Sequence, residues 1–203
     1  MPRPIALVTS LNENGTCNAA PFSAFNYLSE DPPTVALGVT PFGDDSRRHG
    51  GTKDTGRNIV ERLQFTINFV DEPLLPAVAT CAREFAADVS ECVQAGLTLE
   101  ASSTLGRAPR IAQSPISMEC AFRMKVPLDG PRLIIIADVI SMYFRDELFD
   151  PVSFRIDLDR YHPVGRLTGD LYCTTRQRIS VPVRKHVESE TEYRRVNFNP
   201  KAS

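Results

Sequence analysis

The sequence predicts a single, mainly β domain in which helices are interspersed between strands. Most of its apolar segments are short, rich in β-branched or aromatic residues, and ended by Gly, Pro or Asn. Only two segments place apolar residues at helical spacing, and the 203 residues contain no internal repeat or low-complexity linker. Many strands with two helices favour a β-barrel over regular βαβ units. We therefore expect one domain over residues 1–183, followed by a charged C-terminal tail over residues 184–203 that packs loosely or lies across a partner subunit.

The first expected elements form a β-hairpin. Residues 5–11 are apolar and rich in strand-forming residues, and residues 17–22 can form the return strand. Between them stands Asn-Glu-Asn-Gly, in which Gly15 suits the positive φ that tight hairpin turns require. These patterns predict an antiparallel pair at the start of the chain.

The next elements are less regular. A short, possibly helical piece is expected over residues 24–28. Pro32 and Pro33 cannot donate backbone hydrogen bonds to a sheet, so the following strand is expected over residues 34–39. Residues 40–52 are polar and long for a connection in a compact domain, which is typical of functional or mobile loops.

Helical spacing predicts two helices with a strand between them. Asp54 or Thr55 can cap a first helix that runs to about Leu63. Residues 65–70 alternate apolar and polar side chains, as a half-buried strand does. Residues 74–87 then place their apolar side chains on one helical face.

The second half of the chain returns to strands. Residues 116–126 and 132–144 are long apolar segments on either side of an Asp-Gly turn. Shorter strands are expected over residues 152–158 and 167–174. The long pair offers a broad apolar surface, on which a second subunit can pack.

Composition excludes several function classes. The formal net charge of −2 argues against a dedicated nucleic-acid binder. No apolar run approaches the roughly 20 residues of a membrane helix, and no signal peptide is evident, so we expect a cytoplasmic protein. Five cysteines without a C-x-x-C pair and three distant histidines argue against disulfides and a structural metal. Dinucleotide, P-loop and nucleophile-elbow motifs are also absent.

Three segments carry residues with chemical potential. In Asn-Ala-Ala-Pro-Phe-Ser, residues 18–23, small residues and a proline let the backbone approach a flat ligand, and Ser23 and Asn26 offer hydrogen bonds. The alternative is an ordinary strand end. At the start of the first helix, Lys53, Thr55 and free backbone N–H groups can bind an anion. The alternative there is a solvated helix end.

The third segment is His-Pro-Val-Gly-Arg-Leu-Thr-Gly, residues 162–169, followed by Tyr172. Two glycines around Arg166 permit close approach to a planar or charged group. A tight turn before a last strand is the alternative interpretation.

Together these motifs resemble the flavin reductase-like FMN-binding family. The resemblance rests on R-P-I-A-L-V-T-S, N-A-A-P-F-S-x-F-N, D-P-P, K-D-T-x-x-N-I, F-x-I-N and H-P-V-G-R-L-x-G-x-x-Y, in this order from Pro2 to Thr175. It implies a split β-barrel fold and a homodimer with FMN bound in a groove between the subunits.

The resemblance also implies roles for individual residues. Asn18, Ala20, Pro21, Phe22 and Ser23, with Asn26, would line the flavin ring and its ribityl chain. Lys53, Thr55 and Asn58 would lie on the phosphate side, where Ser46 and Arg47 could supply further donors. Arg166 and Gly169 would lie near the cofactor, and His162 beside the nicotinamide or substrate. Arg166 and His162 would be the catalytic residues.

The function that follows is an FMN-dependent oxidoreductase. We expect an NAD(P)H-dependent flavin reductase that transfers hydride from NADH or NADPH to bound FMN and then reduces a small-molecule acceptor. Hydride transfer needs alignment more than a side-chain acid, which agrees with the lack of a catalytic dyad. One alternative is a non-catalytic FMN-binding or electron-carrier protein of the same fold. Another is an interaction barrel that has lost the cofactor. Neither nucleic acid nor membrane is an expected partner.

Overall fold

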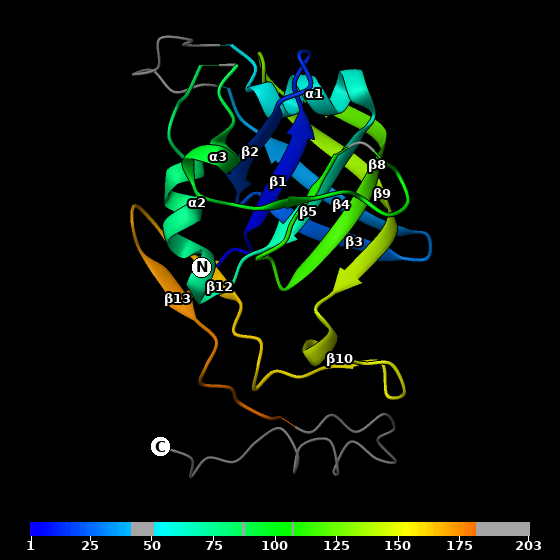
Figure 1. Ribbon diagram of the computed structural model, residues 1–203, viewed down its shortest axis with the longest axis vertical. Coiled ribbons are helices and arrows are strands. Elements are labelled where there is room, and N and C mark those ends of the chain that lie inside the picture. The colour runs from blue at the N-terminus through cyan, green and yellow to red at the C-terminus, as the bar shows by residue number, and fades with distance from the viewer. Residues whose placement is uncertain (42–50, 87, 107, 182–203) are drawn as a thin grey trace, which may run out of the picture.

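The computed structural model describes residues 1–41, 51–86, 88–106 and 108–181 (Figure 1). Within them, one antiparallel sheet has the strand order β2-β1-β5-β8-β9-β4-β3. Its strands are β1 (Ala6–Leu11), β2 (Cys17–Phe22), β3 (Phe25–Glu30), β4 (Pro33–Val39), β5 (Gln64–Phe69), β8 (Ile116–Pro127) and β9 (Leu133–Phe144).

The remaining elements are short. The helices are α1 (Asp54–Arg62), α2 (Leu75–Cys81) and α3 (Glu91–Gln94), with 3-10 turns η1 (Glu72–Leu74) and η2 (Asp146–Leu148). Two-stranded pairs join β6 (Leu99–Glu100) to β7 (Arg110–Ile111), β10 (Phe149–Asp150) to β11 (Arg155–Ile156), and β12 (Val164–Arg166) to β13 (Tyr172–Thr174). In Figure 1, β12 and β13 lie beside α2 at one side of the sheet. No helix of the described segments is long and apolar enough to span a membrane.

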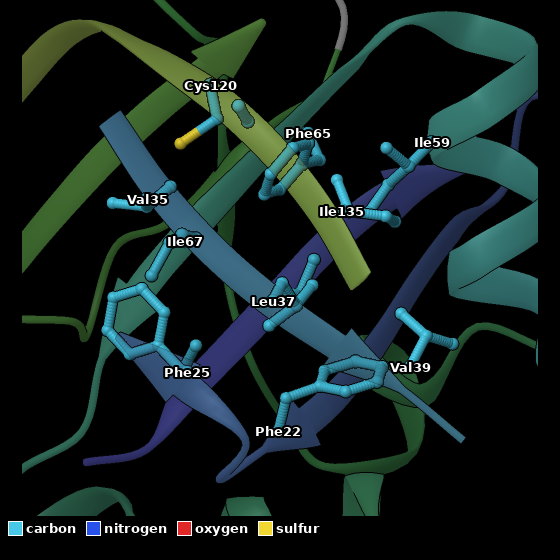
Figure 2. Packing of buried hydrophobic residues seen from close by; sticks show 13 residues of the cluster. Phe22, Phe25, Val35, Leu37, Val39, Ile59, Phe65, Ile67, Cys120 and Ile135 are labelled. Carbon is cyan, nitrogen blue, oxygen red and sulfur yellow. The ribbon is translucent and has the colours of Figure 1, made fainter. Parts of the chain in front are cut away.

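The large sheet curls around one apolar core (Figure 2). Every one of its seven strands contributes at least one buried side chain to this core, and α1 adds Ile59 at one end. Phe65, Leu37 and Ile135 at its centre are fully buried. A sheet whose strands all face the same core is curled into a barrel, as the sequence predicted, and β2 and β3 remain its edge strands.

A second apolar cluster lies outside the barrel, under α2 and α3. Ala6 and Val8 of β1 face the barrel core, whereas Ile5 and Leu7 pack against this outer cluster with Val78 of α2. A strand covered on both faces is apolar at consecutive positions. That explains why residues 5–8 form a continuous apolar run instead of an alternating one.

The predicted hairpins are confirmed. Residues 17–22 pair with β1 in register, and Gly15 has φ +83° in the turn. β8 and β9 pair over almost their whole length, and Gly130 has φ +57° between them. In both cases a residue that tolerates left-handed backbone marks the turn.

Some expected elements are wrong. No helix forms over residues 24–28: residues 25–28 belong to strand β3, because Phe25 packs into the barrel while the backbone pairs with β4. Of residues 152–158 only Arg155–Ile156 is a strand. Residues 167–171 form the turn between β12 and β13, so the predicted strand over 167–174 keeps only its last three residues.

The two helices also differ from the prediction. The N-cap of α1 is Lys53, and neither Asp54 nor Thr55 caps it. The second helix ends at Cys81 instead of residue 87. The chain has to turn there to bring α3 against β2, where Ser90 Oγ donates to the Cys17 carbonyl at 2.7 Å. This tertiary contact overrides the local helical pattern.

A buried carboxylate fixes the loop that crosses the outside of β8. Glu119 is 6% exposed. It accepts hydrogen bonds from the backbone N–H groups of Ser103, Thr104 and Leu105 and from the Ser103 hydroxyl, at 2.6–3.0 Å. Burial alone would raise the pKa of Glu119, but these hydrogen bonds together lower it below its ordinary value.

We expect Glu119→Gln to lower the free energy of unfolding by about 1.5–3 kcal/mol at neutral pH, because the ionised acceptor is lost. The lowered pKa of Glu119 means that this stabilisation is present above the unfolded-state pKa and is lost as pH falls through the folded-state pKa. Urea unfolding of both proteins, at neutral pH and at successively lower pH, measures the difference. Equal stabilities at neutral pH would contradict this role of Glu119.

Candidate functional site

The candidate site follows β2, which is an edge strand of the sheet. The first half of its outer edge is covered by α3: the Ala19 N–H donates to Glu91 Oε2 at 3.0 Å, and Ser90 binds the Cys17 carbonyl. Pro21 has no N–H to offer. Neither half of β2 therefore presents a regular edge for another strand.

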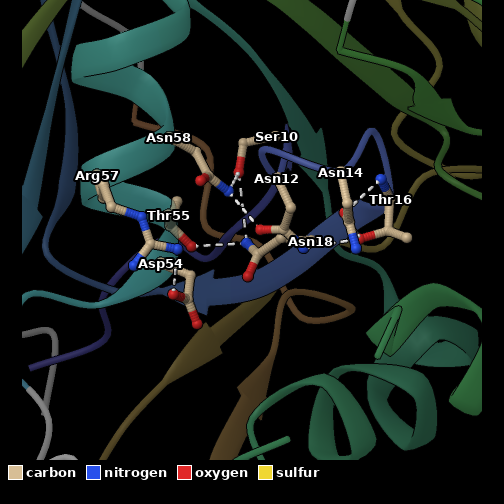
Figure 3. Close-up of polar contacts among 9 residues, drawn as sticks. All are labelled: Ser10, Asn12, Asn14, Thr16, Asn18, Asp54, Thr55, Arg57 and Asn58. Atoms are coloured by element: carbon tan, nitrogen blue, oxygen red, sulfur yellow. Dashed lines mark hydrogen bonds and ion pairs between the residues drawn. The ribbon is translucent and has the colours of Figure 1, made fainter. Parts of the chain in front are cut away.

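One end of β2 is joined to α1 by a buried polar cluster, drawn in Figure 3. The Asn18 amide donates to Thr55 Oγ1 at 2.9 Å and to Ser10 Oγ at 3.4 Å. The Asn58 amide donates to Ser10 Oγ at 3.2 Å and to Asn12 Oδ1 at 2.8 Å. All five residues are at most 5% exposed.

This cluster brings together three residues that the sequence assigned to cofactor binding. Asn18, Thr55 and Asn58 meet, but each is engaged with the protein itself. Buried amides with good partners hold elements in one arrangement. In this structure the three side chains fix the start of α1 against β1 and β2.

The start of α1 adds positive charge beside this cluster. Lys53 is half-buried, and burial lowers its pKa. The N–H groups in the first turn of a helix have no intrahelical acceptor, so this end attracts anions. Two carboxyl groups oppose that attraction. Asp54 lies in the first turn beside Arg57, and burial together with the charge of Asp54 raises the pKa of Glu91.

At its other end, β2 reaches a cavity of about 210 Å³, which we name the β2–β12 cavity. It is lined by Arg3, Ile5, Pro21, Phe22, Ser23, Val78, Ala82, Arg166 and Tyr172. The Arg166 guanidinium donates to the Tyr172 hydroxyl, and its central carbon lies 4.9 Å from the centre of the Tyr172 ring. The early motif around Phe22 and the late motif around Arg166, some 140 residues apart in sequence, thus meet in one place.

The glycines of the late motif have structural roles. A Cβ on Gly165 would lie 2.8 Å from Cys173 Sγ, so only glycine fits at this position of β12, opposite Cys173 of β13. Gly169 has φ +51° in the turn that joins these strands. It does not line the β2–β12 cavity. The sequence predicted that Gly169 lies near the cofactor, and the lining of this cavity gives no support to that prediction.

A larger opening adjoins this cavity and shares Arg3 and Ser23 with it. This β3–β4 cavity has a volume of about 520 Å³. Asn26, which the sequence assigned to cofactor binding, lines it. Ala20 packs against the barrel core and lines neither cavity.

His162 lies apart from Arg166. It lines a different cavity of about 460 Å³ with Asp71 and Arg176, and its Nδ1 is buried without a hydrogen-bond partner in the described part of the chain. The two residues predicted to be catalytic are thus not brought together. Ser46 and Arg47 lie outside the described residues.

The sequence analysis gave no site role to four residues that line the β2–β12 cavity: Arg3, Ile5, Val78 and Ala82. Arg3 exchanges backbone hydrogen bonds with Arg166, at 3.0 and 2.9 Å, and so places β12 beside the chain start. Val78 in the middle of α2 and its C-cap Ala82 also line the cavity. Tyr172 was part of the late motif, but its contact with Arg166 could be read only from the fold.

The arrangement suits an elongated ligand. From Asn18 to Phe22, β2 rises about 13 Å at roughly 3.3 Å per residue. A cationic helix start lies at one end and a partly apolar cavity with an arginine at the other. A flat ring joined by a chain to an anionic group matches this order.

Comparison with known proteins identifies the family of this chain. The model of the flavin reductase like domain matches residues 1–163. An uncharacterised protein of Halalkalibacterium halodurans is 36% identical over 178 residues, with 85% of this chain and 81% of that protein covered. An uncharacterised protein of Aquifex aeolicus is 31% identical over 172 residues, with 85% and 84% covered.

Solved structures show the same fold. The 2-nitrobenzoate 2-nitroreductase of Pseudomonas fluorescens is 40% identical, with a TM-score of 0.82 over 94% of this chain and 89% of that one. The nitrilotriacetate monooxygenase component B of Bacillus cereus is 29% identical, with a TM-score of 0.81 over 89% and 87%. A putative flavin reductase with a split barrel domain from Shewanella frigidimarina, 22% identical with a TM-score of 0.76 over 90% and 86%, supports the fold alone. The chain belongs to the flavin reductase-like family, whose members are split-barrel proteins of flavin-related oxidoreduction.

Proposed function

We propose that this protein is an FMN-dependent oxidoreductase, which takes hydride from NADH or NADPH onto bound FMN and passes electrons to a small acceptor. The observation that carries the proposal is the β2–β12 cavity, where Phe22 and Arg166 meet at one end of β2 while Lys53 stands at the other. The order of these groups along β2 matches the order of ring, chain and phosphate in FMN.

The donor set fits the cofactor. Lys53 and the start of α1 would hold the phosphate. The Pro21–Ser23 segment and Arg166 would face the ring, which supplies the hydride chemistry when bound. Because Asp54 and Glu91 stand close to the phosphate end, Lys53 is the described cation on which binding there depends most.

The polar cluster has a different task in this proposal. Asn18, Thr55 and Asn58 position the helix start relative to β2 and do not themselves contact the cofactor. Arg166 would favour negative charge on the reduced ring from a position fixed by Tyr172. His162 stays a proposed contact of the nicotinamide or acceptor.

We expect Arg166→Ala to slow the reduction of bound FMN by NADH about tenfold or more, since a fixed electrostatic donor is lost. The reduction potential of the bound flavin should fall as well. Stopped-flow absorbance measures the rate, and Arg178→Ala is the matched control because Arg178 is an exposed arginine paired with Asp159. An unchanged rate and potential would mean that the role of Arg166 is purely structural.

A homodimer is the second part of the proposal. β8 and β9 expose four large apolar side chains, Met124, Val126, Ile140 and Met142, whose exposed fractions are 41–51%. Exposed large apolar side chains on two paired strands support a subunit interface here.

We expect light scattering to give about twice the chain mass at micromolar concentration, and Ile140→Asp to give a monomer that binds FMN poorly. Val152→Asp is the control, because Val152 is an exposed apolar residue between β10 and β11, outside both strands. A wild-type monomer that binds FMN tightly would contradict this part.

The acceptor is proposed from the comparison. The neighbour that is 40% identical is named a 2-nitrobenzoate 2-nitroreductase. We therefore propose a nitroaromatic acid as the first acceptor to test, beside free FMN. Steady-state oxidation of NADH or NADPH with either acceptor tests the reductase. Bound FMN without turnover would favour the electron carrier, and absence of FMN binding would favour the cofactor-free barrel.

A further inference from the structure

The β3–β4 cavity has a lining that is both apolar and positively charged. Its walls are Met1, Pro4, Ala24, Phe25, Ala36, Gly38, Val39, Leu128, Leu133 and Ile134, with Ser23, Asn26 and Thr40 as neutral polar groups. Its charged side chains are Arg3 and Arg132. No carboxyl group is among the described residues that line it.

Neither arginine is neutralised by the described protein. Arg3 donates one side-chain hydrogen bond, to the Leu167 carbonyl at 3.2 Å, and forms no ion pair with another described residue. Arg132 makes no side-chain hydrogen bond or ion pair in the described segments. Seven other arginines of the described chain are paired with carboxylates. The two guanidinium groups at this cavity are therefore available to an anion.

The β3–β4 cavity lies next to the proposed flavin site. It shares Arg3 and Ser23 with the β2–β12 cavity, so a ligand held there lies beside the proposed ring position of FMN. A volume of about 520 Å³ is in the range of small-molecule sites. Gly38 lets Ala24 pack closely against β4 in the wall of the cavity, because a Cβ on Gly38 would lie 2.9 Å from Ala24 Cβ.

We propose that the β3–β4 cavity binds a small aromatic carboxylate next to the flavin, with Arg132 and Arg3 as the residues that select the acid. The apolar walls take the ring, and a guanidinium group takes the carboxylate through charge-assisted hydrogen bonds. The proposal rests on the proposed function for the identity of the neighbouring ligand, and it adds the place and the determinants of acid recognition.

The test uses FMN-loaded protein and two probes of the same shape, benzoate and its neutral analogue benzamide, titrated by calorimetry. We expect benzoate to bind more tightly than benzamide. Arg132→Gln should weaken benzoate binding about tenfold and leave benzamide unchanged, since only the charged contact is removed. Arg178→Gln, an exposed arginine outside the cavity, should change neither. Ala36→Leu, which fills the apolar wall, should weaken both probes.

The outcomes separate this inference from the proposed function. FMN binding with no benzoate binding would overturn the acid site and leave the oxidoreductase intact. Equal affinities for benzoate and benzamide, or no effect of Arg132→Gln, would overturn the role of the arginine. If FMN and benzoate exclude each other, the cavity belongs to the flavin and the proposal is wrong. If NADH displaces bound benzoate, and Arg132→Gln still weakens benzoate binding, the result would support one position next to the flavin that the nicotinamide ring and the ring of the acid share.

Discussion

Replacing Lys53 with alanine is expected to weaken FMN binding by about 10- to 150-fold. A charge-assisted hydrogen bond to the phosphate contributes on the order of 1.5–3 kcal/mol, and about 1.4 kcal/mol corresponds to one decade in affinity. The loss should be near the upper end, because Asp54 and Glu91 leave an anion at this helix start dependent on Lys53. Titration by flavin fluorescence measures the dissociation constant.

Riboflavin separates the phosphate contact from a general effect on the fold. It lacks the phosphate, so it should bind the wild type poorly and lose little more in the variant. Arg62→Ala is the matched control, because Arg62 is a cation in the last turn of the same helix, about 12 Å from its start. Equal losses for FMN and riboflavin would mean that Lys53 acts through folding, and the phosphate assignment would be withdrawn.

Replacing Asn58 with alanine is expected to lower the free energy of unfolding by about 2–4 kcal/mol. Asn58 is 1% exposed, and its amide serves Ser10 and Asn12 at once. The variant leaves buried polar partners without their donor, which costs about 1–3 kcal/mol for each unsatisfied group. Urea unfolding measures the effect, and Glu61→Ala on the exposed side of α1 is the control.

The same variant tests the role of the polar cluster in binding. If Asn58 only positions the start of α1, the remaining folded protein should lose affinity for FMN and riboflavin by similar factors. A loss confined to FMN would instead place Asn58 in contact with the phosphate, as the family resemblance implies. Lys53 and Asn58 are thus distinguished by opposite patterns with the same two ligands.

The sequence predicted the barrel where local chemistry decides structure. Gly15 and Gly130 mark turns that need left-handed backbone, and the apolar segments on either side of each turn pair with each other. It failed at residues 24–28 and at the end of α2. There, pairing of β3 with β4 and the contact of Ser90 with Cys17 decide the conformation, and neither partner is local in sequence.

The site was predictable in its parts and not in its assembly. Phe22 and Arg166 were singled out by motif, but their meeting depends on the bridge between Arg3 and Arg166. Asn18, Thr55 and Asn58 are residue types that occur in binding sites, but here they are buried and hydrogen-bonded within the protein. Residue types indicate which bonds a side chain can make. Its partners are set by packing.

The most direct test of the account is the visible absorption spectrum of purified, FMN-loaded protein before and after anaerobic addition of NADH or NADPH. We expect FMN to bind in a stoichiometric complex, the band of the oxidised flavin to be lost on addition of the nicotinamide, and this band to return when an acceptor is admitted. Failure to take up FMN, or bound FMN that neither nicotinamide reduces, would contradict the central claim.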